Sequence, residues 1–308
     1  MPRGRRDTAE VLARAAFARH FGKPPRRMER TGGGLQNDVL CVRHAEGRFV
    51  IRIGRDPAKI NAFIKEQWSM KAAQAAGVPV PEVLEVANDG HGRPYMISRE
   101  VDGVPGLKHA DRITILRSLG ELAKRVHSVH TKGYGRTFDW SHNQLSRNKS
   151  FGEFLSRELD VESRLDTLRR NRMVEPARLA RLAAELQRLA RWRKPAVLNH
   201  GDLRLKNIIV DEDGRIAALL DWDQALSSAG PWWDLSIALH DLSIDEKQAF
   251  VEGYGLKAKH LKECAPAMRV LNVINYVPRV EELAAQKEVA GLEALRMRLS
   301  GAFDLYAL

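Results

Sequence analysis

Three polar residues, His200, Asp202 and Asn207, form the pattern His-x-Asp-x-x-x-x-Asn in the second half of the chain. A carboxylate such as that of Asp202 can accept the proton of an alcohol, and the amide oxygen of an Asn is a suitable ligand for Mg²⁺. Enzymes that transfer phosphoryl groups use an Asp followed five residues later by an Asn in this way. The pattern therefore predicts a phosphoryl-transfer centre in this segment.

A predicted β-hairpin follows the pattern and ends at another carboxylate. Residues 208–210 are a short run of Ile and Val, residues 211–214 end in an Asp-Gly turn, and residues 216–220 are the return strand. Antiparallel pairing would bring Asp221 back beside Asn207. Because Mg²⁺ prefers a few protein oxygens and completes its shell with phosphate oxygens and water, these two residues are the expected metal ligands.

Four short motifs in this region resemble those of the aminoglycoside phosphotransferase family, which includes choline-kinase-like and macrolide kinase relatives. The motifs are His200-Gly201-Asp202, Asn207, Leu220-Asp221-Trp222 and Asp234-Leu235, and the resemblance extends from about residue 30 to about residue 239. It implies a protein-kinase-like fold in which Asp202 is the catalytic base and Asn207 and Asp221 hold Mg²⁺. It also implies a structural role for Asp234 and a loop-positioning role for His200.

The N-terminal third contains the residues that are expected to bind the phosphates of a nucleotide. Gly34 and Asn37 resemble the family's Gly-x-x-Asn loop, in which glycines let backbone N–H groups approach a phosphate; the alternative is a flexible hairpin turn. The alternation of residues 49–53 puts Arg52 where kinases usually carry a phosphate-pairing Lys, and Arg offers a planar fork instead of a compact ammonium. Its expected partner is Glu66; the alternative is two ordinary surface charges.

The backbone around Ser98, Arg99 and Val101 is expected to receive the adenine of ATP, with GTP as the alternative nucleotide. Near the catalytic loop, Arg204 stands where protein kinases carry a Lys and aminoglycoside kinases often carry a His. A fixed cation at this place could stabilise charge on the transferred phosphoryl group in the transition state. The nearby Lys206 is assigned no role, and the alternative for it is an outward orientation.

The resemblance implies an α+β fold of two lobes, and the periodicity of the sequence agrees with a small β-rich N-lobe and a larger, mainly helical C-lobe. We expect a nucleotide-binding lobe over residues 1–101, a hinge at about 98–104, and a helical lobe with the catalytic loop and acceptor site over 105–308. Apart from the hairpin, everything after residue 105 is expected to be helical. The expected strands are 27–31, 39–43, 49–53, 83–86 and 95–101, and the expected helices are 8–20, 57–76, 112–131, 152–171, 176–193, 232–242, 246–254 and two more before the C-terminus.

The net charge of +11 favours anionic partners, and ATP is one, although nucleic acid or a membrane surface would also fit. Much of the charge lies on an amphipathic helix around residues 178–193, where arginines oppose a leucine stripe. Because Trp192 is the single aromatic residue among these arginines, the run lacks the series of aromatic residues that a base-stacking surface needs, and we expect no nucleic-acid partner. Without an apolar run of 18 residues or an apolar leader, the chain is expected to be cytoplasmic and not bound to a membrane. Its oligomeric state is left open.

Other polar residues carry weaker expectations. Cys41 and Cys264 are too few for a disulfide scaffold or a zinc site and are expected to be buried, reduced thiols. His127 and His130 lie on one face of a predicted helix, and without a carboxylate or Cys nearby they are interpreted as core or surface histidines.

The predicted function is transfer of the γ-phosphate of ATP to a hydroxyl of a small molecule. An aminoglycoside-type antibiotic is the first acceptor class on family resemblance alone, with a macrolide or a metabolic alcohol such as choline behind it. A polycationic acceptor should need carboxylates, for which the candidates are Asp160, Glu162, Asp223, Glu281 and Glu282. The positive net charge is not an obvious match for such an acceptor.

Two rival functions compete with the small-molecule kinase. A protein kinase needs a long activation segment, but only 13 positions lead from Asp221 to Asp234, and no Ala-Pro-Glu is present. A catalytically silent nucleotide-binding protein is suggested by Arg52. The intact set of Asp202, Asn207 and Asp221 argues against it, because a silent fold has no physical need for all three.

Overall fold

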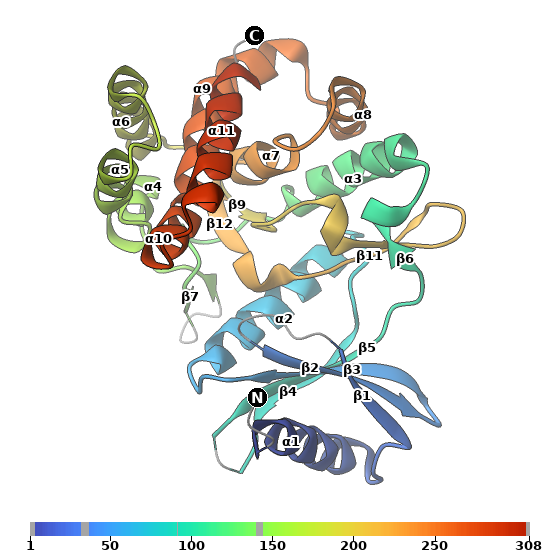
Figure 1. The fold of residues 1–308 in the computed structure, drawn as a ribbon. Helices are drawn as coiled ribbons and strands as arrows, with labels where there is room; N and C mark the ends of the chain where they lie inside the picture. The colour runs from blue at the N-terminus through green and yellow to red at the C-terminus, as the bar shows by residue number, and fades with distance from the viewer. Residues whose placement is uncertain (1–3, 32–36, 91, 140–143, 306–308) are drawn as a thin grey trace. The chain divides into compact units, whose positions relative to one another are not determined.

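The computed structural model describes residues 4–31, 37–90, 92–139 and 144–305, and the chain forms two compact units (Figure 1). The first unit consists of Met1–His109 and Ile208–Asp223, and the second of Ala110–Asn207 and Gln224–Leu308. The expected boundary lay at residues 101–105 and left the hairpin with the second lobe. In the structure the first unit continues to His109 and includes the hairpin.

The first unit is built on a five-stranded antiparallel sheet with the strand order β1-β2-β3-β5-β4. Each of the five expected strands is present. They are β1 (Arg27–Thr31), β2 (Asn37–His44), β3 (Gly47–Gly54), β4 (Val83–Asn88) and β5 (Pro94–Arg99). The two expected helices are α1 (Gly4–Phe21) and α2 (Lys59–Ala75), and they cover opposite faces of the sheet (Figure 1).

The alternation of side chains in β3 decides what each face of the sheet carries. Phe49, Ile51 and Ile53 are buried in a core shared with Phe17 of α1, and burying each such side chain contributes about 1.5–3 kcal/mol. Because successive side chains of a strand point to opposite faces, Arg52 points to the α2 side. The same period that builds the core therefore directs a guanidinium towards α2.

A smaller sheet of three strands completes the first unit, with the order β11-β10-β6. Its strands are β6 (Val104–Pro105), β10 (Ile208–Val210) and β11 (Ile216–Leu219), and the 3₁₀ turn η1 (Gly106–Lys108) follows β6. The predicted hairpin is confirmed, with Ile208 opposite Leu219. The carboxylate of Asp211 closes the turn by accepting the N–H groups of Asp213 at 3.0 Å and Arg215 at 2.8 Å.

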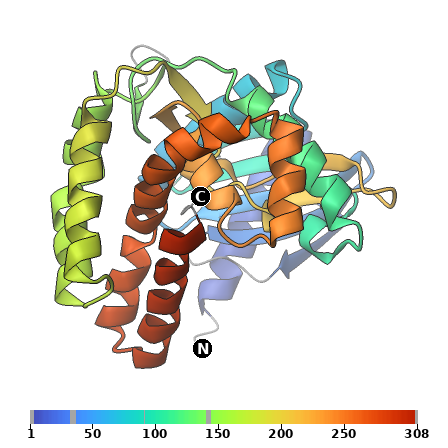
Figure 2. The same ribbon diagram turned by 90° about the horizontal axis from the view of Figure 1, so that it is seen from above.

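The second unit is mainly helical, as expected. Figures 1 and 2 show α3 beside α8, and α11 alongside α9. Its helices are α3 (Arg112–Val126), α4 (Phe151–Glu153), the π-helical turn η2 (Phe154–Glu158), α5 (Val161–Arg170), α6 (Pro176–Ala190), α7 (Trp232–Ala238), α8 (Ile244–Tyr254), α9 (Ala258–Asn275), α10 (Val277–Ala285) and α11 (Val289–Leu305). None of the helices in the described ranges has the length and hydropathy of a transmembrane span.

Three expectations for the second unit were wrong. The single helix expected over residues 152–171 is interrupted, because Asp160 adopts a left-handed conformation with φ +48° and caps α5 by accepting the N–H of Ser163 at 3.3 Å. Three helices, not two, follow residue 254. The region also contains short strands besides the hairpin: β7 (Phe138–Asp139) pairs with β8 (Gln144–Leu145), and β9 (Ala196–Asn199) with β12 (Leu226–Ala229).

The amphipathic helix is confirmed as α6. Its leucine stripe, Leu179, Leu182, Leu186 and Leu189, is buried. The helix ends at Ala190, so Arg191 and Arg193 lie beyond it. Cys41 and Cys264 are free thiols, but they are half-buried where burial was expected. Partial burial raises the pKa of both thiols above its ordinary value, which disfavours the reactive thiolate.

Candidate active site

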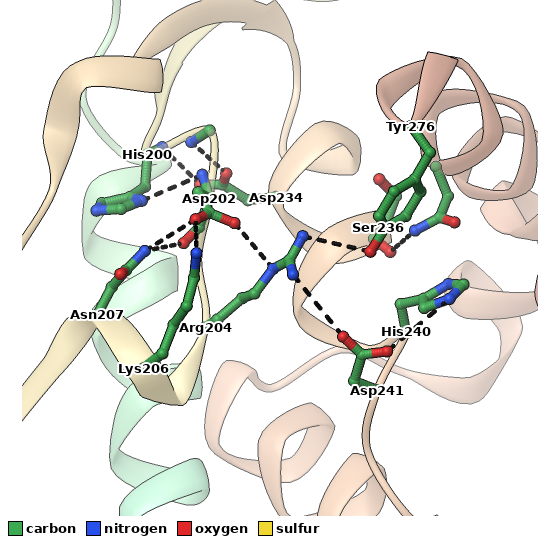
Figure 3. Close-up of polar contacts among 12 residues, drawn as sticks. His200, Asp202, Arg204, Lys206, Asn207, Asp234, Ser236, His240, Asp241 and Tyr276 are labelled. Carbon is green, nitrogen blue, oxygen red and sulfur yellow. Dashed lines mark hydrogen bonds and ion pairs between the residues drawn. The ribbon is translucent and has the colours of Figure 1, made fainter. Parts of the chain in front are cut away.

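The buried carboxylate of Asp234, in the first turn of α7, holds the start of the catalytic loop. It accepts the backbone N–H groups of His200 and Gly201, both at 2.7 Å (Figure 3). Its own N–H donates to the side chain of Asn199, the last residue of β9, at 3.2 Å. Because charge-assisted hydrogen bonds inside a protein are strong, this carboxylate fixes the backbone that leads to Asp202. The geometry agrees with the structural role implied for Asp234.

His127 is a further partner of this carboxylate, and the interpretation of it as lacking one was wrong. The helix α3 ends at Val126, and the His127 ring is buried with Nε2 3.1 Å from Oδ2 of Asp234. Its Nδ1 lies 3.1 Å from the hydroxyl of Tyr254, whose pKa is raised by burial and by the charge of Asp234. The contact joins residues 107 positions apart, and no local pattern in the sequence marks it.

Gly201 gives the loop a conformation that other residues resist. Its φ is +87°, and a Cβ atom there would lie 2.0 Å from the backbone oxygen of Gln224. The next N–H, that of Asp202, donates to Nδ1 of the buried His200 at 3.2 Å. His200 therefore contacts the loop backbone, which agrees with the positioning role that the resemblance implied.

The carboxylate of Asp202 is held by three side chains from the same loop (Figure 3). Nε of Arg204 lies 2.8 Å from Oδ1, Nζ of Lys206 lies 2.7 Å from Oδ2, and Nδ2 of Asn207 lies 3.1 Å from Oδ2. Burial acts to raise the pKa of Asp202, but these donors outweigh it and hold the pKa below its ordinary value. Asp202 is therefore an ionised, firmly oriented acceptor at neutral pH.

Lys206, for which no role was assigned, contacts Asp202 with its ammonium and does not simply point outward. Its side chain is half-exposed, so the ammonium bridges the carboxylate and the solvent. Lys206 belongs to the short 3₁₀ turn η3 (Leu205–Asn207) and follows Asp202 by four residues. Two cations, from Arg204 and Lys206, thus lie at Asp202 where one was expected.

Asn207 presents its amide in a defined orientation. Nδ2 donates to the backbone oxygen of Asp202 at 2.8 Å as well as to its carboxylate. Because the nitrogen is committed to Asp202, the amide oxygen is the atom that remains for a metal ligand. Among the described residues, no group of three or more His, Cys, Asp or Glu side chains could hold a metal ion.

Arg204 extends from Asp202 to residues that no sequence motif had marked. Its Nη2 donates to the hydroxyl of Tyr276 at 3.3 Å, and its Nη1 lies 3.9 Å from a carboxylate oxygen of Asp241 (Figure 3). Tyr276 follows α9, and Asp241 lies between α7 and α8. The sequence carries no signal for this grouping, because it depends on how the helices of the second unit pack.

In the first unit, the expected pair of Arg52 and Glu66 is present. The two guanidinium nitrogens of Arg52 lie 2.6 and 3.1 Å from the carboxylate oxygens of Glu66, whose side chain is 1% exposed, and the guanidinium covers the ring of Phe63. Burial acts to lower the pKa of Arg52, but the charge of Glu66 outweighs it, and Asp221 and Asp223 act in the same direction. The pair is not an ordinary surface contact, and Arg52 stays charged.

Asp221 has a backbone conformation that is rare for a residue with a side chain. It follows β11 with φ +63°, a left-handed value that Asp and Asn adopt more readily than other residues with a side chain. Such conformations are concentrated at functional sites, where surrounding structure maintains them. Asp223 was considered for an acceptor pocket, but it belongs to the first unit, where its backbone oxygen accepts Nζ of Lys65 at 2.6 Å.

The expected adenine-binding segment follows the last strand of the large sheet. Ser98 and Arg99 end β5, and the N–H of Arg99 is engaged by the backbone of Glu82 at 2.9 Å. The N–H of Glu100 donates to the backbone of Arg48 at 3.0 Å, so Val101 remains the candidate donor for a base. Gly34 lies outside the described residues. Asn37 is the first residue of β2, and its side chain is buried.

The other four carboxylates considered for binding a polycationic acceptor lie on or next to the helices α5 and α10. Asp160 caps α5, and Glu162 is exposed on the first turn of that helix. Glu281 accepts the hydroxyl of Thr167 at 3.1 Å, and Glu282 pairs with Arg279 on the same helix. Three of these four carboxylates thus have partners within the second unit, and the charges of Asp160 and Glu281 both act on Arg164.

The arrangement of the chain is that of a known structural class. A solved ternary complex of a thermostable mutant of aminoglycoside phosphotransferase APH(4)-Ia with AMP-PNP and hygromycin B matches with a TM-score of 0.69. The match covers 96% of this chain and 98% of that one at 17% sequence identity, so it demonstrates the fold alone. The chain therefore has the protein-kinase-like fold that the sequence predicted.

The family follows from the sequence itself. The model of the phosphotransferase enzyme family (APH) matches residues 27–271, and the chain belongs to this family. Mouse acyl-CoA dehydrogenase family member 10 is 27% identical over 66% of this chain and 19% of its own length. Hygromycin-B 4-O-kinase of Escherichia coli is 23% identical over 58% of this chain and 52% of its own length. The chain thus spans about a fifth of the first relative and about half of the second.

Proposed function

We propose that this protein transfers the γ-phosphoryl group of ATP to a hydroxyl of a small molecule. The observation that carries the proposal is the ionised Asp202, held by Arg204, Lys206 and Asn207 in a loop that Asp234 anchors. Phosphoryl transfer depends mainly on positioning and charge stabilisation, and this loop provides both. Membership of the phosphotransferase enzyme family supports the same reaction.

In this mechanism Asp202 accepts a hydrogen bond from the acceptor hydroxyl and orients its oxygen towards the γ-phosphorus. The carboxylate is a weak base, because its donors keep its pKa low. It therefore orients the hydroxyl in the ground state and takes its proton as the new oxygen–phosphorus bond forms and the bond from the γ-phosphorus to the leaving ADP breaks. The cations of Arg204 and Lys206 stabilise charge on the transferred group and its surroundings.

The first unit would bind the nucleotide. Arg52, kept charged by the buried Glu66, would pair with the phosphates, while Gly34 and Asn37 would form the phosphate loop. The segment from Ser98 through Arg99 to Val101 would receive the base. The AMP-PNP in the solved APH(4)-Ia complex supports a nucleotide in this fold, and we propose ATP, with GTP as the alternative.

Asn207 and Asp221 would hold Mg²⁺. Their chemistry fits, since Asn207 offers an amide oxygen whose nitrogen is already engaged and Asp221 offers a carboxylate just after β11. The ion would neutralise charge on the β- and γ-phosphates. Asn207 directly precedes β10, whose Ile208 pairs with Leu219 of β11, so one hairpin connects the two proposed ligands.

Two acceptor classes are proposed for the hydroxyl. Aminoglycosides are supported by the names of hygromycin-B 4-O-kinase and of the solved APH(4)-Ia complex. A metabolic alcohol is favoured by the charges of the loop, because Arg204 and Lys206 flank Asp202 and would repel a polycation.

An ATP-consumption assay with Mg²⁺ tests the reaction across aminoglycosides, macrolides, amino alcohols and hydroxy acids. The wild type should turn over at least one acceptor, and Asp202→Ala should lose at least roughly 1,000-fold in kcat while keeping its affinity for ATP. Asp213→Ala, at an exposed carboxylate of the hairpin turn, is the matched control and should remain active. Full activity of Asp202→Ala, or ATP binding without turnover on every acceptor, would contradict the proposal.

A further inference from the structure

A cluster of basic side chains surrounds the region beyond Asp202 in the second unit. We define the arginine–tyrosine cluster as Arg204, Tyr276 and Arg298. Arg204 belongs to the catalytic loop, Tyr276 connects α9 to α10, and Arg298 lies on α11, so three separate elements converge there. Figure 3 shows Arg204 reaching from Asp202 to Tyr276 and Asp241.

The hydroxyl of Tyr276 lies between the two guanidinium groups. It accepts Nη2 of Arg298 at 2.8 Å and Nη2 of Arg204 at 3.3 Å, and both guanidinium groups also lie against the aromatic ring. Burial raises the pKa of this phenol, and the two arginines only partly offset the effect. Tyr276 is therefore neutral, and its own O–H hydrogen remains available to donate to a further acceptor.

The positive charge of this region is not balanced by the carboxylates beside it. Arg204 pairs with Asp202, and Arg298 with Asp241, while Lys206 adds a cation at Asp202. Asp241 lies near both guanidinium groups, but it carries a single negative charge. Three cations thus face two carboxylates, Asp202 and Asp241. His240 adds no positive charge at neutral pH, because burial lowers its pKa to about 4.

The cluster is also open to a ligand. The side chain of Arg204 is 24% exposed, that of Arg298 37% and that of Asp241 49%. Because exposure screens the attraction between Arg298 and Asp241, this pair is weak and its guanidinium is accessible to a ligand.

We infer that the acceptor alcohol carries an anionic group, a carboxylate or a phosphate monoester, which the arginine–tyrosine cluster binds while the hydroxyl lies at Asp202. This inference rests on the proposed function. Two arginine forks and a phenol O–H match the several acceptor oxygens of such a group, and Arg is suited to bidentate contact with both chemistries. Asp241 then occupies, in the absence of acceptor, the place that the anionic group takes when it binds.

A polycationic acceptor fits this surface poorly. It would bring its ammonium groups against Arg204, Lys206 and Arg298, and like charges at close range are repelled. Two of the acidic residues that could have received it, Asp160 and Glu281, are engaged within their own part of the second unit. The charges therefore favour an anionic acceptor over an aminoglycoside.

Calorimetric titration of the full chain, saturated with AMP-PNP and Mg²⁺, tests the inference without requiring turnover. The probes are 3-hydroxybutyrate and glycerol 3-phosphate, each beside its neutral counterpart, 3-hydroxybutyramide or glycerol, with hygromycin B as the polycation. One or both anionic probes should bind at least roughly 10-fold more tightly than the neutral counterpart, and also more tightly than hygromycin B by the same factor. Comparison of the two probe pairs distinguishes recognition of a carboxylate from recognition of a phosphate.

Three variants locate the binding. Arg298→Gln should weaken the anionic probe by roughly 10- to 100-fold, the loss expected for hydrogen bonds between charged groups. Asp241→Asn should strengthen it by roughly 3- to 10-fold, because a competing negative charge is removed. Arg296→Gln, an exposed arginine on the same helix, should change nothing. If the cluster had only a structural role, Arg298→Gln and Asp241→Asn would not change the affinity for the anionic probe in opposite directions.

The inference is overturned if hygromycin B binds more tightly than both anionic probes, if neither anionic probe binds, or if Arg298→Gln retains wild-type affinity while folded. Thermal unfolding of each variant establishes the folded state. The proposed function is contradicted by a different result, in which the anionic probes bind in this pattern but no acceptor supports ATP consumption. Binding and turnover thus report on the two proposals independently.

Discussion

The carboxylate of Asp234 lies 2.7 Å from the backbone nitrogen of His200, so a buried charge at the start of α7 holds the first residue of the catalytic loop. The same carboxylate also receives Gly201 and His127. The loop that carries Asp202 is therefore fixed from behind, by groups that do not face the proposed acceptor. Stability and activity should both depend on this anchor and on the charged pairs around it.

Asp234→Ala should lower the free energy of unfolding by about 3–5 kcal/mol, because it leaves two backbone donors and Nε2 of His127 unpaired in the interior. Urea denaturation measures the loss. The control is Asp213→Ala at an exposed carboxylate, which should change stability by less than about 0.5 kcal/mol. Equal effects of the two substitutions would contradict the anchoring role.

Gly201→Ala should cost more than about 3 kcal/mol and strongly reduce turnover, since both the positive φ and the 2.0 Å approach to Gln224 oppose a Cβ atom. Gly22→Ala separates these two causes. Gly22 has φ +70°, and a Cβ atom added there would meet no other atom within 4 Å, so the substitution should cost only about 1–2 kcal/mol. Similar losses in the two variants would show that backbone strain alone matters.

Lys206→Met should reduce kcat/KM by roughly 10- to 100-fold at pH 7, because a charge-assisted contact to Asp202 is lost. The pH profile provides a second readout. Asp202 must be ionised to act, and its donors hold its pKa below the ordinary value, so activity falls only as the pH drops through that low pKa. Removing one donor raises the pKa, and the acid limb should move to higher pH. Lys206→Arg should restore most of the wild-type profile.

The pair of Arg52 and Glu66 predicts a non-additive response to substitution. Arg52→Met should cost about 3–5 kcal/mol of stability, because it leaves the buried Glu66 unpaired. Adding Glu66→Gln removes that stranded charge, so the double variant should be more stable than Arg52→Met alone. A thermal-unfolding double-mutant cycle measures this coupling. The same Arg52→Met variant should bind ATP more weakly if the guanidinium contacts the phosphates.

Stability should fall as the pH drops from 6.5 towards 4 because of His240. Burial lowers the pKa of this ring to about 4, so over this range the unfolded chain binds a proton that the folded chain does not. After allowance for partial solvent screening, the loss is on the order of 2 kcal/mol. His240→Gln should flatten this part of the profile in urea denaturation, whereas the same change at the exposed His260 should leave it unaltered.

The sequence determined those features that depend on local spacing. Alternating residues predicted the strands of the first unit and the orientation of Arg52, and the turn at Asp211 predicted the hairpin that connects Asn207 to Asp221. Motif spacing within the catalytic loop marked Asp202. These features could be predicted because covalent geometry and the periods of helix and strand operate over a few residues.

Tertiary packing decided the features that join distant segments. The contact of His127 with Asp234, and the meeting of Arg204, Tyr276 and Arg298, link residues that no local period relates. The strands β9 and β12 were missed for the same reason, since each is too short to be recognised apart from its partner. The spacing of the motif was therefore encoded locally, whereas the charge around Asp202 depends on which helices bring their side chains to its loop.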